Sequence, residues 1–140
     1  MPDISATIRT KTLADASISS SVGTRMYSDV LPQNVSLPAI TYQVIDTLAH
    51  QHLSGIADVA QARIQIDCYA ATRSAANALA DDVRLALQGQ NHTATGSQCI
   101  LDILMPSGEV HSIDEAESGS DIRRYVTTQD FQVSYRTTTS

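Results

Sequence analysis

The sequence predicts a single domain over residues 1–140, of class α/β in its α+β form. We expect one mainly antiparallel β-sheet, one long helix packed across it, and one or two N-terminal helices alongside. Three observations predict this class. A length of 140 residues suits one folding unit, 42% hydrophobic and 17% charged residues suit a packed core, and segments of period-two alternation surround one strongly periodic helix.

The N-terminal segment predicts two short helices. Apolar residues recur at helical spacing between Asp3 and Val22, and Pro2 and Asp3 are placed as a helix start. Asp15 can cap the second helix, which Gly23 then ends. Two helical pieces are therefore expected before a brief strand at Met26-Tyr27.

An antiparallel pair of strands is predicted after an irregular connection. The connection is marked by Pro32, Asn34 and Pro38. Side chains alternate between two faces in Ala39–Asp46 and again in Ala60–Ala70. The intervening segment, Thr47–Val59, contains Gly55 and is too long for a tight turn, so it predicts a flexible, projecting hairpin loop.

The strongest helix signal lies in Ala75–Leu87. Thr72 or Ser74 can cap it, and Gly89 can end it. One face is apolar and would pack on the sheet; it consists of Ala76, Leu79, Ala80, Val83 and Leu87.

The C-terminal half predicts further strands. The expected elements, in order, are a polar connector at Asn91–Gly96, a strand at Cys99–Met105, a weaker strand at Val110–Ile113 in a hairpin with it, a flexible acidic loop at residues 114–121, a closing strand at Tyr125–Arg136, and a frayed tail at Thr137–Ser140.

Composition excludes several classes of function. Nine Lys and Arg against fifteen Asp and Glu give 9 − 15 = −6, which argues against a surface that neutralises nucleic-acid phosphates. No apolar run approaches the roughly 20 residues needed to cross a bilayer, and we expect no signal peptide and no membrane partner. Two cysteines are too few for a disulfide framework, which favours reduced thiols.

Groups that could carry chemistry give weak signals. His50 and His52 could chelate a metal with His92 or His111, but no established ligand spacing accompanies them. Solvated loop histidines are the simpler interpretation. The two cysteines, Cys68 and Cys99, sit at inward positions of predicted strands, which favours core packing over nucleophilic catalysis. Neighbouring Asp81 and Asp82 diverge by about 100° on a helix, so they are better read as solvating charges.

The segment order resembles the tail-completion, or tail-terminator, proteins of long-tailed bacteriophages and related tailed particles. The resemblance spans most of the chain. It is carried by the early helix into Leu13-Ala14-Asp15 and by Val22–Tyr27, Leu37–Tyr42, Arg63–Ala70, Ala75–Leu87 with Asp82-Val83-Arg84, and Asp130–Arg136.

The resemblance implies a structural virion protein with no cofactor and no catalytic residues, made in the host cytoplasm. Copies would form a homo-oligomer, a hexameric ring, on the last ring of the tail tube protein. That ring would stop tube growth and join the tail to the head–tail connector, or stopper, protein. DNA would pass through the ring without specific binding.

Two surfaces are candidates for contacts in such a particle. The predicted hairpin loop, with two leucines in a polar segment, is the candidate contact for the tube or a neighbouring copy; its residues are Leu48, His50, His52 and Leu53. The acidic loop is either ordinary solvated surface or a channel-facing surface that repels DNA phosphates; its residues are Asp114, Glu115, Glu117 and Asp121.

Two other functions fit the same pattern. A small regulatory or ligand-binding α+β domain would have a similar sheet and helix. A metal-assisted hydrolase would use His50 and His52. Solution mass and metal content, respectively, distinguish these from a ring-forming structural protein.

Overall fold

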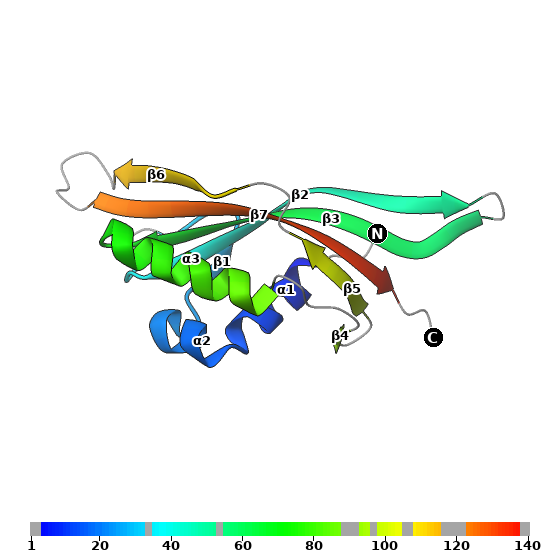
Figure 1. Cartoon of the computed structure of the whole chain (residues 1–140), viewed down its shortest axis with the longest axis horizontal. Helices are drawn as coiled ribbons and strands as arrows, with labels where there is room; N and C mark the ends of the chain where they lie inside the picture. The colour runs from blue at the N-terminus through cyan, green and yellow to red at the C-terminus, as the bar shows by residue number, and fades with distance from the viewer. Residues whose placement is uncertain are drawn as a thin grey trace.

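The protein has three helices on one side of a twisted sheet, and no helix covers the opposite face of the sheet in the part of the chain that is described (Figure 1). The computed structural model describes residues 4–32, 35–52, 55–87, 93–95, 98–104, 108–115 and 123–137. Its elements are α1 (Ser5–Leu13), α2 (Ala16–Val22), β1 (Met26–Ser28), β2 (Ala39–His52), β3 (Gly55–Ala70), α3 (Arg73–Leu87), β4 (Thr93–Thr95), β5 (Gln98–Leu104), β6 (Val110–Glu115) and β7 (Arg123–Thr137).

The seven strands form one sheet in the order β1-β2-β3-β7-β5-β4, with β6 also paired to β7. All pairings are antiparallel except that of β1 with β2. The predicted α+β class and mainly antiparallel sheet are therefore confirmed. Strand β7 is the centre of this arrangement, because β3 pairs along one of its edges while β5 and β6 share the other.

Asp15 and Gly23 mark the two ends of α2, as predicted. The Asp15 carboxylate accepts hydrogen bonds from the backbone N–H groups of Ser17 at 2.9 Å and Ile18 at 3.4 Å, which starts α2. Gly23 ends α2 with a φ of 62°, a conformation that glycine adopts without steric cost. Helix α1 begins at Ser5 after Ile4; the predicted start at Pro2 and Asp3 lies outside the described residues.

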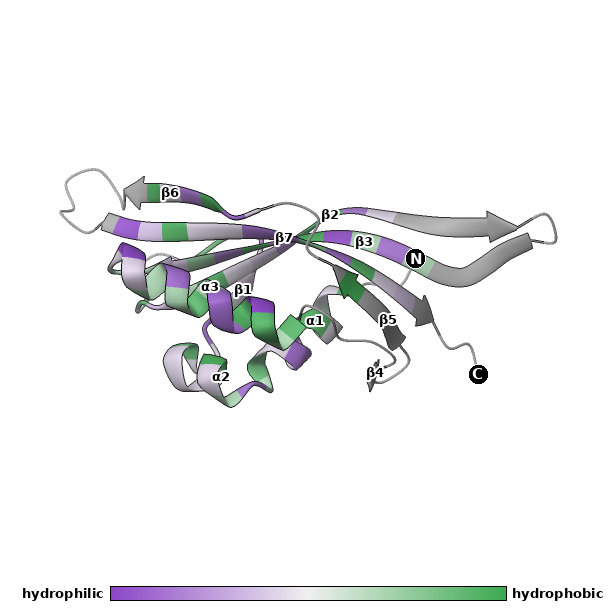
Figure 2. Cartoon of the chain, viewed as in Figure 1, coloured by the Kyte–Doolittle hydropathy of each residue, from purple (hydrophilic) through white to green (hydrophobic). Residues whose placement is uncertain are grey.

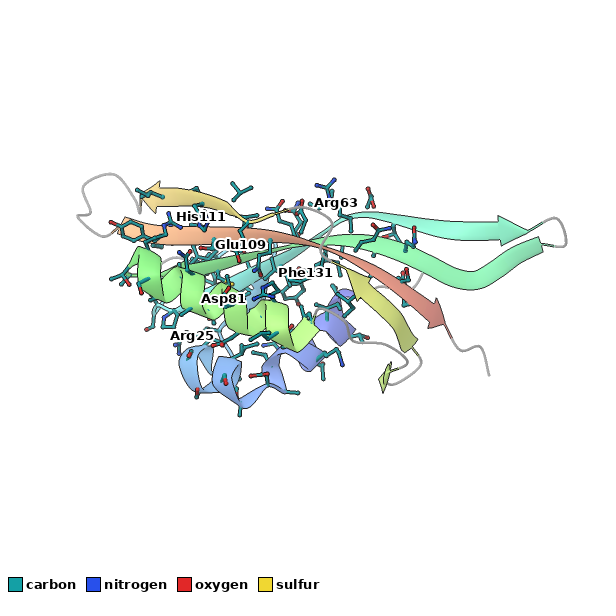
Figure 3. All side chains as sticks on the ribbon, viewed as in Figure 1. Arg25, Arg63, Asp81, Glu109, His111 and Phe131 are labelled. Carbon is teal, nitrogen blue, oxygen red and sulfur yellow. The ribbon has the colours of Figure 1, made fainter. Side chains whose placement is uncertain are left out.

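The core lies between the sheet and the helices, as the alternation predicts. The inward residues of β3 are at most 1% exposed; they are Ala62, Ile64, Ile66, Cys68 and Ala70. In β7, Phe131, Val133 and Tyr135 are also buried. Figure 3 shows Phe131 between the sheet and the helices, whereas Arg63 lies on the face that no described helix covers. We call that second face the open face.

Helix α3 supplies the other wall of the core. The Thr72 hydroxyl accepts the Ala75 N–H at 3.1 Å, so Thr72 caps the helix, which begins at Arg73 rather than at Ala75. The five predicted inward residues of α3 are all buried. The apolar spacing thus identified both the helix and its packed face.

The predicted loop at Thr47–Val59 is wrong for most of its length. Residues 47–52 belong to β2 and residues 55–59 to β3, paired from Thr47↔Ala62 to His52↔Gly55. The register shifts between Val44 and Asp46 and again between Ala49 and Gln51. Such bulges break the period-two pattern, which is why the alternation did not reveal the strands.

Three predictions in the C-terminal half also need correction. The weak strand at Val110–Ile113 pairs with β7 rather than in a hairpin with β5, because β7 is long enough to hold both strands on one edge. Asp114 and Glu115 lie in β6, not in a flexible loop, and Thr137 lies in β7, not in a frayed tail. The polar connector contains the short strand β4, which pairs with β5.

Candidate interaction surfaces

The extended β2–β3 hairpin projects beyond the helices (Figure 1). We call residues 47–52 and 55–59 the hairpin arm. Its register places Leu48 opposite Gln61 and His52 opposite Gly55. The predicted contact residues Leu48, His50 and His52 therefore share one strand of the arm, and Leu53 lies outside the described residues.

One long edge of β2 has no strand beside it after the first few residues. Strand β1 pairs with β2 only at Ile40–Tyr42. Within the described ranges, no strand pairs with the same side of β2 from Gln43 to His52. Ile45, at the first register shift, is 42% exposed on this stretch. Sequence alternation did not single out Ile45, because it is the extra residue of a bulge.

Strand β6 forms a second free edge on the other side of the sheet, because no described strand pairs with it on the side away from β7. It pairs with the N-terminal half of β7, and Val110 and Ile113 are 61% and 53% exposed. Figure 2 shows hydrophobic bands on β6. Asp114 lies opposite Arg124 and Glu115 opposite Arg123. The remaining two members of the predicted acidic surface, Glu117 and Asp121, lie outside the described residues.

Arg73 at the start of α3 fastens β6 and β7 to the helix. Its guanidinium donates to the carbonyl oxygens of Ser112 at 2.6 Å and Val126 at 2.8 Å. It also lies 5.4 Å from the centre of the Tyr125 ring, within cation–π range. No sequence pattern singled out Arg73 for this role, because an arginine at the start of a helix has many uses.

A polar chain continues from Arg73 into the core. His111 lies 3.5 Å from Arg73 and 3.8 Å from the Glu109 carboxylate, and Glu109 accepts a 3.1 Å hydrogen bond from Gln129 (Figure 3 labels His111 and Glu109). Gln129 is fully buried and also donates to the Ala80 carbonyl oxygen at 3.1 Å. The one sequence signal for this cluster is a polar residue, Gln129, at an inward position of β7; it was not predicted to be buried.

The open face of the sheet is a polar surface with paired charges. Arg63 and Asp130 form an ion pair at 2.6 Å, and the Thr128 hydroxyl donates to Asp67 at 2.6 Å. The hydrogen bond and negative charge of Asp130 raise the pKa of Arg63 above its ordinary value. The charges of Arg63 and Asp130 are thus balanced within the face.

Among the side chains that the structure describes, the candidate catalytic and metal-binding groups are not gathered into a site. Cys68 is buried, and this burial raises the pKa of its thiol, which opposes thiolate chemistry. Asp81 forms an exposed 3.9 Å ion pair with Arg84 on the same helix. No three potential metal ligands cluster among the residues with described positions, and His92 is not one of those residues.

No described helix is both long and apolar enough to cross a membrane.

Comparisons with known proteins give one family and one fold. The family model described as "Tail completion protein gp17" matches residues 6–110, which is 105 of the 140 residues. A solved chain from "Virion of native gene transfer agent (GTA) particle" has the same fold, with a TM-score of 0.63 and 19% identity over 91% of each chain. No curated protein matches the chain.

Proposed function

This chain belongs to the tail completion protein gp17 family, and on that premise we propose that six copies form a ring that caps the tail tube. The ring stops tube elongation and joins the tail to the head connector. It works through complementary surfaces and needs no cofactor or catalytic residue. The chain is a structural protein of a tailed virion, and the ring is the specific form that we propose for it.

The observation that carries the proposal is the family match over three quarters of the chain. The shared fold with a chain of a virion particle supports it. A closed ring also requires two different contact patches on every copy. The hairpin arm and the β6 edge are two such patches on opposite sides of one sheet. Stable contacts of this kind bury about 800 Å² per partner.

We assign the hairpin arm to the contact with the tube protein or a neighbouring copy. The arm projects from the body of the protein, and a two-stranded projection can lie across an adjoining subunit. The residues assigned to this contact are Leu48, His50, His52 and Leu53. Replacing Leu48 and Leu53 with Ser should weaken attachment to purified tubes while leaving the fold intact.

We assign the acidic residues at the end of β6 and in the segment that follows it in the sequence to the bore. Negative charge near a channel repels passing phosphates and so keeps DNA from binding to the wall. The assigned residues are Asp114, Glu115, Glu117 and Asp121. Asp114 and Glu115 lie opposite Arg124 and Arg123 in the backbone register of β6 and β7.

Charge reversal tests the bore assignment. Reversing Asp114, Glu115 and Glu117 to Lys should slow DNA ejection. Reversing Asp81 and Asp82 on α3 provides a control at a different place, to be compared with the two-residue reversal of Asp114 and Glu115, which changes the charge by the same amount. Equal ejection rates in all variants and in the unaltered protein would remove the bore assignment.

Copy number tests the ring itself. Quantitative mass spectrometry of purified particles should give six copies of this chain per particle, and image averages of the tail end should show sixfold symmetry. The mass of the isolated chain is a companion measurement, because a ring protein can be monomeric until it meets its tube. A single copy per particle would contradict the ring.

A further inference from the structure

We propose that the open face of the sheet lines the bore of the ring, and that contacts within this face keep its arginines from binding the phosphates of passing DNA. The inference rests on the proposed ring and names the surface along which DNA moves. This surface is the side of β3 and β7 that no described helix covers.

The middle of the open face is polar. In β3, Arg63, Gln65 and Asp67 alternate with the buried residues Ile64 and Ile66. Among the described side chains, the large hydrophobic residues that are exposed lie outside β3 and β7. A contact between proteins usually has an apolar centre that is depleted of charged residues. The open face therefore suits a surface that stays in contact with water, as the wall of a DNA channel does.

The charged groups of the open face are engaged with one another. Arg63 pairs with Asp130 at 2.6 Å, and Asp46, opposite Arg63 in the register, adds a second negative charge near it. Arg124 lies 6.0 Å from the centre of the Tyr69 ring. The described charges of this face are two arginines and three aspartates, giving 2 − 3 = −1; they are Arg63, Arg124, Asp46, Asp67 and Asp130.

An unpaired arginine in the bore would hold DNA. Arginines and lysines that neutralise phosphates supply most of the affinity that proteins have for DNA of any sequence. A ring of six copies repeats each such arginine six times. Because the Asp130 carboxylate binds the Arg63 guanidinium, each copy presents a balanced pair in place of a free positive charge.

The direction of the hairpin arm sets how the sheet stands in the ring. The arm prolongs β2 and β3 beyond the helices (Figure 1). An arm that reaches the tube protein, one of the two partners assigned to it, places these strands along the ring axis. The open face and the helix layer then turn in opposite directions, one toward the axis and the other outward.

The width of the sheet gives the size of the ring. The five strands β1, β2, β3, β7 and β6 lie side by side and span about 24 Å, at about 4.8 Å per strand. Six such widths give a perimeter of about 144 Å and a radius of about 23 Å at the sheet.

A ring of this radius has room for DNA in only one orientation. With the open face inward, side chains take about 5 Å from the radius, which is half the spacing of packed sheets, and leave an opening about 36 Å wide. With the helices inward, a layer spacing of about 10 Å and a helix radius of about 5 Å leave an opening of about 16 Å. A B-form duplex, with grooves about 8.5 and 7.5 Å deep, is about 20 Å across. The widths therefore favour the open face toward the axis.

Four variants test the charge balance. Asp130→Asn frees Arg63 and makes each copy more positive by one charge, Arg63→Gln does the opposite, and a variant with both changes restores the balance. DNA should leave Asp130→Asn particles about tenfold more slowly in about 50 mM salt, and the delay should shrink in about 200 mM salt, which weakens phosphate binding. Arg63→Gln and the double variant should release DNA at the unaltered rate. Asp81→Asn, which frees Arg84 on α3, is the matched control and should have no effect.

The double variant separates charge from structure. All three variants at Arg63 and Asp130 lose the ion pair, so a purely structural role predicts the same delay in each. That result would overturn the charge balance. Release at the unaltered rate from Asp130→Asn particles in low salt would overturn it as well.

Thiol labelling of purified particles after DNA release tests the orientation. Gln65→Cys on the open face and Asp81→Cys on α3 are made in a Cys99→Ser background, in which the remaining Cys68 is buried. A small maleimide enters the bore, whereas a maleimide carried on a globular protein of about 500 residues, about 60 Å across, does not. Gln65→Cys should react with the small reagent alone, and Asp81→Cys should react with both.

The outcomes separate this inference from the proposed function. Reaction of Gln65→Cys with both reagents would place the open face outside the ring, and reaction with neither would place it against another protein. Either result, in particles with six copies, would overturn the inference and leave the ring standing. One copy per particle would overturn the ring and this inference together.

Discussion

The Arg73 guanidinium, at the first residue of α3, lies 2.6 Å from the carbonyl oxygen of Ser112 in the middle of β6. This contact links the main helix to a strand at the edge of the sheet. A second hydrogen bond from Arg73 reaches Val126 in β7, the strand that pairs with β6. The position of the β6 edge therefore depends on a side chain from the opposite layer of the protein.

Arg73→Ala should loosen β6 and destabilise the protein by about 1–3 kcal/mol, because charge-assisted hydrogen bonds to two carbonyl groups are lost. Hydrogen exchange should accelerate at the amides of β6 before those of β3. Arg84→Ala is the control on the same helix; its exposed ion pair with Asp81 predicts a change of less than about 0.5 kcal/mol. Equal exchange at β6 in both variants would contradict the anchoring role.

Gln129→Ala should lower the free energy of unfolding by about 2–4 kcal/mol. The change removes the hydrogen bonds to Glu109 and Ala80 and leaves a cavity in the core. Gln129→Met keeps the volume and loses only the polar contacts, so its cost should be smaller. Urea denaturation of both variants measures the difference. An unchanged free energy of unfolding in Gln129→Ala would show that the buried amide is dispensable.

Asp15→Ala should destabilise the protein by about 1 kcal/mol, the usual cost of removing a helix cap. The side chain accepts hydrogen bonds from two backbone N–H groups at the start of α2. Asp15→Asn retains an acceptor oxygen and should cost only a few tenths of that amount. Thermal denaturation of the two variants separates capping from charge, since only the alanine variant loses the acceptor.

Stability should fall at alkaline pH because of Cys68. Burial raises the pKa of its thiol above the ordinary 9.0, so the folded state keeps a proton that the unfolded state releases. This contribution is fully present below about pH 9 and is lost as the pH rises, by about 1.4 kcal/mol per pH unit. Cys68→Ala should make the slope of the unfolding free energy against pH shallower by nearly that amount between about pH 10 and 11. Identical slopes would contradict it.

The sequence predicted an element correctly where one regular spacing of apolar residues runs through the whole of that element. The spacing of Leu79, Val83 and Leu87 identified α3 and its buried face, and the alternation of Ile64 and Ile66 identified β3 with its inward side. These patterns succeed because burial on one face imposes a strict repeat on the sequence.

Prediction failed where geometry depends on distant partners. The bulges around Ile45 and at Ala49–Gln51 interrupt the repeat, so the arm read as a loop. The pairing of β6 with β7 could not be read locally, because it depends on the length of β7. The sequence pointed to the segment of the hairpin arm as a contact. It did not reveal the free edges of β2 and β6, because an edge is defined only by the order of the strands in the sheet.

Tail length in particles produced without this chain tests the central claim most directly. Electron microscopy should show tails that are overlong or of variable length and are not joined to heads, and supplying the unaltered chain should restore normal particles. Uniform tails of ordinary length attached to filled heads in its absence would contradict the account.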